Sequence, residues 1–168
     1  TGTVSTFGTN TLTINSPTQT VGFIGNGMDF TAGAAPSFKQ CAPQNAALYQ
    51  NANNNGSSPN CGGASAGDQV YSLTPTQDAS LQLSLTNVAG GMRPVVYVRS
   101  TCDDAQSELK CNSQQVPNQG TNLTIGYLQA NHTYFVWVDG SGGTTGTYTL
   151  TASLTAPVVP PAGDFCAV

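Results

Sequence analysis

Apolar and polar residues alternate with a period of two along several stretches of the chain. Residues 81–85 (LQLSL) carry Leu at every second position, and residues 148–154 (YTLTASL) begin with the same alternation. Residues 134–138 (YFVWV) are instead a continuous apolar run. Alternation is typical of a strand with one buried face, and a short apolar run is typical of a central strand buried on both faces. The pattern therefore predicts strands rather than helices.

The same patterns predict about eight strands, at residues 9–14, 20–24, 69–73, 81–85, 94–98, 122–127, 134–138 and 148–154. Pairs of residues typical of tight turns separate them, namely Asn26-Gly27, Gly90-Gly91, Asp139-Gly140 and Gly142-Gly143. Many short strands with such turns are typical of an antiparallel sandwich or barrel, so the sequence predicts an all-β fold.

Two stretches depart from the strand pattern. Residues 31–67 show no strand period and contain an Asn-rich cluster, which predicts a long loop that a disulfide would hold to the sheet. Residues 156–161 are Pro-rich, as stiff linkers are. We therefore expect a single domain over residues 1–156, followed by a Pro-rich linker and C-terminal docking tail over residues 157–168.

The chain is polar but almost uncharged, and this excludes several classes of function. Only 7% of its 168 residues are charged, and the net charge is −4. Four Lys and Arg residues cannot neutralise a run of phosphates, so we expect no nucleic-acid partner. No apolar stretch is long enough to span a membrane as a helix.

The cysteines indicate an oxidising compartment. None stands in a Cys-x-x-Cys pair, and the chain has one His, so a zinc site is not expected. The simplest pairing joins Cys41 to Cys61 and Cys102 to Cys111, although the sequence allows others. Disulfides form outside the cytosol, and the chain starts at Thr1 without a signal peptide. We interpret it as a mature secreted product or a cut-out segment, extracellular or at the cell surface.

One cysteine, Cys166, is left over by that pairing. It could bond another chain, bond a partner missing from this segment, or remain a free thiol near a frayed end, and the sequence leaves these alternatives open. The tail beyond the Pro-rich linker carries Phe165, Cys166 and Val168. If the tail docks on a neighbouring subunit, these three residues are its expected intersubunit contacts.

Catalytic chemistry finds little support in the sequence. An enzyme needs a positioned nucleophile, acid or base. The chain has one His, His132, at the start of the most apolar strand, and one Glu, Glu108. No Gly-x-Ser-x-Gly motif marks a serine. We expect no enzyme, and we interpret His132 as a surface or strand-end residue.

A calcium ion is the one cofactor that the residues suggest. Asp103, Asp104 and Glu108 lie close together in sequence, and carboxylates on a constrained loop suit a hard cation. The interpretation that we prefer is that Asp103 and Asp104 are solvated turn residues and that Asp139 accepts hydrogen bonds from turn amides.

Aromatic residues could form a platform for a glycan. Trp137 lies in the most apolar strand and is expected in the core, which leaves Tyr49 and Tyr127 as the less buried candidates.

Four segments carry a family resemblance. They are residues 67–73 (GDQVYSL), 94–99 (PVVYVR), 128–140 (LQANHTYFVWVDG) and 146–150 (GTYTL), with Cys102 and Cys111 between the second and the third. In this order and spacing they resemble the bacterial pre-peptidase C-terminal domains, which are modules appended to secreted peptidases and large surface proteins. The match covers roughly residues 60–155. The resemblance implies a jelly-roll-like β-sandwich and a non-catalytic role, and it supplies no ligand residues.

Two functional hypotheses follow. In the first, the chain is a structural subunit of a bacterial surface filament or polymer that self-associates head-to-tail through its C-terminal tail. In the second, the chain is an accessory module of a larger secreted enzyme or adhesin and binds a glycan or matrix protein through the 31–67 loop or a sheet face. The low charge and the unpaired tail cysteine lead us to prefer the first.

Overall fold

The computed structural model describes residues 10–15, 21–25, 28–32, 57–63, 66–102 and 104–157, the first three of these segments through their backbone only. The strands are β1 (Asn10–Asn15), β2 (Val21–Gly25), β3 (Met28–Ala32), β4 (Gln69–Pro75), β5 (Ala79–Ala89), β6 (Pro94–Arg99), β7 (Glu108–Ser113), β8 (Thr121–Leu128), β9 (Tyr134–Gly140) and β10 (Thr147–Thr155). Two short 3₁₀ helices, η1 (Ala105–Ser107) and η2 (Ser141–Gly143), connect strands.

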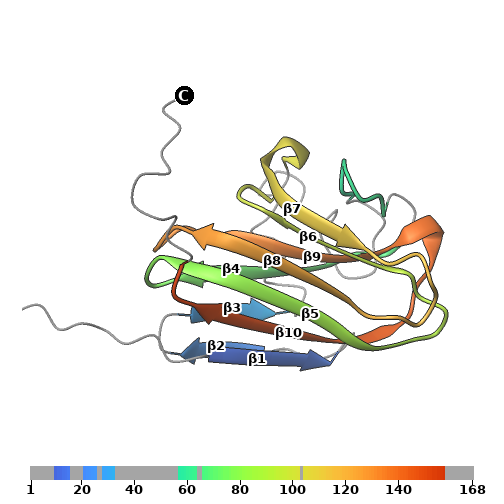
Figure 1. The fold of residues 1–168 in the computed structure, drawn as a ribbon, viewed down its shortest axis with the longest axis horizontal. Helices are drawn as coiled ribbons and strands as arrows, with labels where there is room; N and C mark the ends of the chain where they lie inside the picture. The colour runs from blue at the N-terminus through green and yellow to red at the C-terminus, as the bar shows by residue number, and fades with distance from the viewer. Residues whose placement is uncertain are drawn as a thin grey trace, which may run out of the picture.

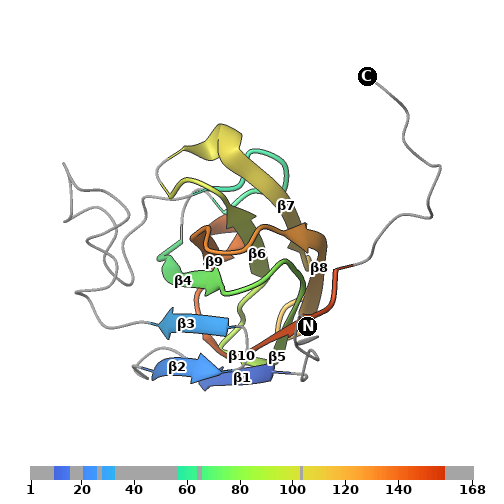
Figure 2. The ribbon, with the colours of Figure 1, turned by 90° about the vertical axis from the view of Figure 1, so that its left-hand side faces the viewer.

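The strands form two antiparallel sheets packed face to face. One sheet has four strands in the order β1-β10-β5-β8, and the other has six in the order β2-β3-β4-β9-β6-β7. Figure 1 looks onto the four-stranded sheet with the six-stranded sheet behind it, and Figure 2 shows the two layers from the side. The orders β1-β10-β5-β8 and β4-β9-β6-β7 are those of a jelly roll, to which β2 and β3 are added. The predicted all-β, jelly-roll-like sandwich is confirmed.

Each of the eight predicted strands is present, and the structure adds β3 and β7. The predicted loop from residue 31 begins with the end of β3, and residues 33–56 lie outside the described part. β3 pairs with β2 in a register that places Gly25 opposite Met28. β7 lies at the edge of the six-stranded sheet, and its residues are half-buried or exposed along its whole length. An edge strand needs no apolar alternation, so its sequence resembles that of a loop.

The main core lies between the two sheets. It is formed by alternate residues of β5, β8 and β10 on one side and of β4, β6 and β9 on the other. Leu81, Leu83 and Leu85 enter it from β5, as the alternation predicted, and Leu150 enters it from β10. A hydrogen bond of 2.7 Å joins the hydroxyls of Tyr71 and Tyr148 inside this core. Burial raises the pKa of Tyr71 to about 12, so this phenol stays neutral and its bond ties one sheet to the other.

A second set of buried residues covers the opposite face of the six-stranded sheet. We call Val70, Val95, Tyr97, Cys102 and Trp137 the outer cluster. β6 is buried along its whole length because its residues alternate between the main core and this cluster. β9 lies between β4 and β6 and is buried in the same way, which confirms the predicted central strand.

The two sheets are joined along one side by side chains of β7. β8 is an edge strand, so carbonyl groups on its outer side have no neighbouring strand. Lys110 Nζ donates to the carbonyl of Thr124 at 2.9 Å, and Asn112 Nδ2 donates to the carbonyl of Asn122 at 2.6 Å. These bonds occupy the β8 edge and oppose the addition of a further strand there.

In the described residues, no helix is long and apolar enough to cross a membrane.

Replacing Leu150 by Ala should destabilise the fold by about 2–5 kcal/mol, because its fully buried side chain leaves a cavity between the sheets. Thr151→Ala is the matched control: the neighbouring residue faces outward, and its loss should cost less than about 1 kcal/mol. Urea unfolding curves of both variants measure these differences. Equal losses would contradict the assignment of the two faces of β10.

Candidate functional site

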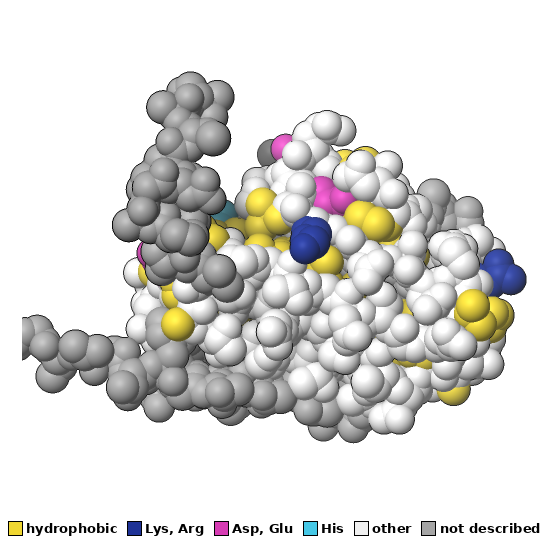
Figure 3. All heavy atoms as spheres, viewed as in Figure 1, with side chains coloured by type: hydrophobic (Ala, Val, Ile, Leu, Met, Phe, Trp, Pro, Cys, Tyr) yellow, Lys and Arg dark blue, Asp and Glu magenta, His cyan; other side chains and the backbone are white. Residues whose placement is uncertain are grey.

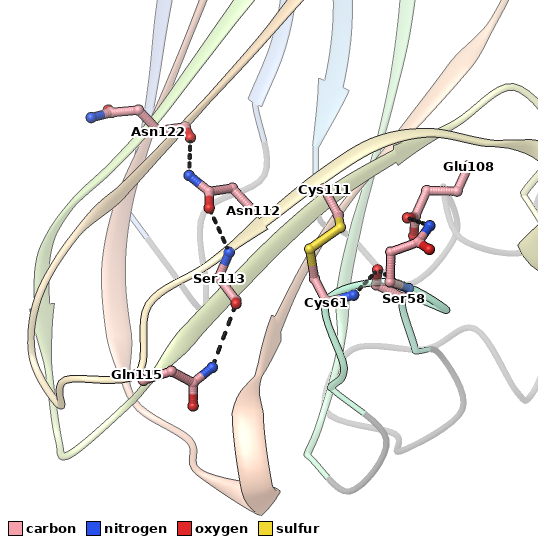
Figure 4. The surroundings of a disulfide bond; sticks show 9 residues. Ser58, Cys61, Glu108, Cys111, Asn112, Ser113, Gln115 and Asn122 are labelled. Carbon is pink, nitrogen blue, oxygen red and sulfur yellow. Dashed lines mark hydrogen bonds between the residues drawn. A yellow bond between two sulfur atoms is a disulfide. The ribbon is translucent and has the colours of Figure 1, made fainter.

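The disulfide of the described region joins Cys61 to Cys111, with 6.1 Å between their Cα atoms (Figure 4). The simplest pairing, Cys41–Cys61 with Cys102–Cys111, is therefore wrong. Cys111 lies within β7, opposite Tyr97, and its sulfur bonds that of Cys61, which is 50 residues away in sequence. Cys102 is disulfide-bonded as well, to a partner outside the described residues.

The segment 57–63 lies over the outer cluster and is held there at several points. Its ends are closed by backbone hydrogen bonds between Ser58 and Gly62, and the Ser58 hydroxyl accepts from the amide of Cys61 at 2.9 Å. Asn60 donates from Nδ2 to Glu108 Oε1 at 2.8 Å. Together with the disulfide, these bonds fix the segment against β7 (Figure 4).

A buried cation, Arg99, connects this segment to the aromatic residues of the outer cluster. The Arg99 guanidinium lies 5.0 Å from the ring centre of Tyr97 and 4.9 Å from that of Trp137. The two rings are stacked at 5.6 Å. The guanidinium nitrogens of Arg99 donate to the carbonyls of Ser57 at 2.6 Å and Cys102 at 3.2 Å. The guanidinium is permanently charged, so these cation–π and hydrogen-bond contacts provide the pairing that its burial requires.

Two buried carboxyl groups, Asp68 and Asp139, lie next to each other on the same face. Asp68 directly precedes β4 and Asp139 is on β9, and the register Gln69↔Val138 brings the two residues side by side. Both are buried, and Asp139 Oδ1 accepts from the amide of Gly140 at 2.6 Å. Burial, followed by the charge of Asp68, raises the pKa of Asp139 to about 9. At neutral pH the two neighbouring carboxyl groups therefore hold a proton between them.

The carboxylates predicted to hold calcium have other partners. Asp104 caps η1, and its Oδ1 accepts from the amide of Gln106 at 2.8 Å. Glu108 accepts from Asn60, and Asp103 lies outside the described residues. Within the described part of the chain, no three His, Cys, Asp or Glu side chains gather as a metal site would need. The calcium site stays a prediction.

The remaining predicted residues divide by exposure and position. His132 is exposed and makes an edge contact with the ring of Tyr134, so it is the surface residue that we expected. Trp137 is fully buried and Tyr127 is 55% exposed, as predicted for core and surface. Five residues lie outside the described part, namely Cys41, Tyr49, Phe165, Cys166 and Val168.

The open face of the four-stranded sheet carries a feature that sequence reasoning missed. A hollow of about 390 Å³ opens on this face, over β5, β8 and β10. It is lined by Gln82, Leu83, Ser84, Asn122, Thr124, Thr151 and Ser153. Six of these seven residues are polar and none is charged, and Figure 3 shows the same face as a largely white surface. We call this region the polar hollow.

Strand register arranges the polar hollow as two parallel rows. One row runs across Thr151, Ser84 and Asn122, and the other runs across Ser153, Gln82 and Thr124. Neighbouring strands lie about 4.8 Å apart, so each row presents hydroxyl and amide groups at a short, regular spacing. The alternation of β5 and β10 could have indicated this face, but the strand order needed to assemble it cannot be obtained from the sequence.

Comparisons with known proteins give only distant likenesses. No protein-family model and no curated protein matches the sequence. Among solved structures, the K3 cleaved adhesin domain of Lys-gingipain from Porphyromonas gingivalis W83 is 14% identical, with a TM-score of 0.35 over 54% of this chain and 63% of that one. The K1 cleaved adhesin domain of the same protein is 17% identical, with a TM-score of 0.33 over 88% and 98%.

A ruminal GH26 endo-β-1,4-mannanase is 13% identical, with a TM-score of 0.32 over 56% of this chain and 19% of that one. The matches to the K3 domain and to the mannanase thus span less than two thirds of those chains. At these scores the likenesses support no assignment of function.

Peptide mapping of the unreduced protein should give a fragment that joins Cys61 to Cys111. Trypsin with chymotrypsin separates the relevant cysteines, because cleavage after Tyr49 and after Lys110 divides both pairs of the simplest arrangement. Mass spectrometry before and after reduction identifies the linked peptides. A fragment that joins Cys102 to Cys111 would contradict the structure.

Stability should fall as the pH rises, because Asp139 holds a proton in the folded protein up to a pKa of about 9. In the unfolded chain an Asp loses its proton near pH 4, so the folded state binds more protons between these values. The stabilisation from the neutral carboxyl is complete below the unfolded pKa and is lost as the pH approaches the folded one.

Asp139→Asn keeps the shape without the titration, and its melting temperature should vary less than that of the wild type between about pH 5 and about pH 8. Asp104→Asn, at an exposed cap that Asn also suits, is the control and should keep the wild-type slope. The same slope in all three proteins would mean that Asp139 is ionised in the fold.

Proposed function

We propose that the chain is a non-enzymatic binding module of a secreted protein and that it holds a neutral polysaccharide on the polar hollow. The observation that carries this proposal is the composition of the hollow, in which hydroxyl and amide groups from three strands line one open depression without a charge. Hydroxyl and amide groups both donate and accept hydrogen bonds, as the hydroxyls of a sugar do. The side chains that line the hollow carry no charge to attract phosphate or carboxylate groups, and the ammonium of Lys110 is bonded to the Thr124 carbonyl at the β8 edge.

The extracellular location is supported by the disulfide chemistry. Cys61–Cys111 is bonded, and Cys102 is bonded as well, which suits an oxidising compartment. The resemblance of residues 60–155 to pre-peptidase C-terminal domains supports a module that accompanies other domains. A catalytic role has less support, because His132 contacts Tyr134 and Glu108 bonds Asn60.

Assembly into a filament through the C-terminal tail stays a prediction, because residues 158–168 lie outside the described part. The contacts at β8 concern one possible form of assembly, in which a neighbouring subunit adds a strand to this edge. Lys110 and Asn112 already occupy carbonyl groups of that edge, so a neighbouring subunit could not add a strand to β8 without displacing them. No feature of the described residues favours polymerisation over binding.

The test is binding of the purified chain to insoluble neutral polysaccharides, for which cellulose, chitin and xylan are suitable probes, with heparin as an anionic comparison. Thr124→Arg places a long charged side chain in the polar hollow at an exposed position, so we expect at least about a tenfold loss of affinity. Thr145→Arg makes the same change at an exposed loop position outside the hollow and should bind like the wild type.

Sedimentation with the polymer gives the affinities, and melting temperatures show whether each variant is folded. Failure of the wild-type chain to bind any of the neutral polymers would overturn the proposed function. Equal binding by both Arg variants would place the site elsewhere on the molecule.

A further inference from the structure

A β-bulge turns one aromatic side chain of β8 outward. Leu81 pairs with Ile125 and Ala79 pairs with Leu128, so the single residue Ser80 faces both Gly126 and Tyr127. In a regular strand, Tyr127 would follow Leu123 and Ile125 into the core. The extra residue reverses the alternation, so Leu128 is fully buried and Tyr127 is 55% exposed.

The bulge is stabilised by its own contacts rather than being a frayed strand end. The Ser80 hydroxyl donates to the carbonyl of Ile125 at 2.9 Å, and Ser80 is itself buried. Gly126 is exposed, and a Cβ added there would meet no atom within 4 Å. The side chain missing at Gly126 therefore leaves open space between Thr124 and Tyr127, on the outward side of the strand.

The ring of Tyr127 is fixed in place by an acidic side chain. Tyr127 Oη donates to Asp78 Oδ2 at 3.0 Å, and Asp78 Oδ1 accepts from the amide of Ala130 at 2.8 Å. The hydrogen bond to Asp78 raises the pKa of the Tyr127 hydroxyl, which therefore stays a donor. One carboxylate oxygen of Asp78 thus holds the hydroxyl of Tyr127, while the other is fixed to the backbone at Ala130. An exposed ring that is already held in this way loses little conformational freedom when a ligand covers it.

Tyr127 lies close enough to the polar hollow for one ligand to contact both. Asn122 and Thr124 line the hollow from β8, and Tyr127 lies three residues beyond Thr124, or about 10 Å along the strand. Among the exposed large hydrophobic residues of the described part, which are Leu109, Val116 and Tyr127, it is the aromatic one. An aromatic face attracts the weakly positive C–H groups of a sugar ring, whereas aliphatic side chains offer no such face.

We propose that Tyr127 is the stacking platform of the binding face and that the bound polymer runs along β8. One sugar ring lies on the face of Tyr127, and the next sugars lie over Gly126 and in the polar hollow, where hydroxyl and amide groups bind their edges. This inference rests on the proposed function. It adds the aromatic residue, the direction of the chain and the requirement that the ligand presents a flat, uncharged ring.

The experiment compares Tyr127→Ala with Tyr127→Phe in the same polysaccharide assay. The Ala variant loses the ring and should bind about tenfold more weakly. The Phe variant keeps the ring and loses only the bond to Asp78, so its affinity should stay within about threefold of the wild type. Leu109→Ala removes an exposed apolar side chain from β7 and is the control, which should bind as the wild type does.

The outcomes separate this inference from the proposed function. If Thr124→Arg abolishes binding while Tyr127→Ala binds normally, the polar hollow is the site and the platform is wrong. If the wild type binds no neutral polymer, both proposals fail. Equal losses in the Ala and Phe variants would also overturn the platform, because they would assign the effect to the hydroxyl rather than to the ring. Melting temperatures within a few degrees of the wild type exclude misfolding as the cause.

Discussion

The arrangement of the molecule depends on a sheet that must be covered on both faces. β6 and β9 present apolar side chains in both directions, so the six-stranded sheet packs against the other sheet on one face and needs a second cover on the other. The segment 57–63 provides part of that cover. A short segment that lacks a regular strand or helix cannot stay on a sheet through apolar contact alone. The Cys61–Cys111 disulfide and the hydrogen bond from Arg99 to the Ser57 carbonyl hold this one in place.

The four-stranded sheet is under the opposite constraint, because only one of its faces is buried. Its outward residues are free to be polar, and those of β5, β8 and β10 that line the polar hollow are hydroxyl and amide side chains without charge. Under the proposed function, the division between the sheets therefore separates stability from binding. Buried charge, disulfide and stacked rings lie on the outer face of one sheet, and the face that we propose for ligand lies on the other.

The sequence predicted the fold well and the site poorly, for physical reasons. Burial of one or both faces leaves a period along a strand, so β5, β9 and β10 are evident from the sequence alone. The proximity of residues on different strands leaves no such period in the sequence. For example, Asp68 and Asp139 lie side by side because of the register between β4 and β9. Tyr127 was predicted among the less buried aromatic residues, but the reason for its exposure is a bulge, because unbroken alternation after Leu123 and Ile125 would place its ring in the core. The partner of Cys61 depends on Cys111 being in a strand, which the polar sequence of β7 conceals.

The side-chain bonds from β7 to the β8 edge also determine how the module would carry mechanical load. A polymer held along β8 would pull on an edge strand, which could peel from β5 one backbone bond at a time. Lys110 and Asn112 fasten that strand to the other sheet at Thr124 and Asn122, the two residues that line the hollow from β8. Tension on the polymer would then be shared between both layers of the sandwich.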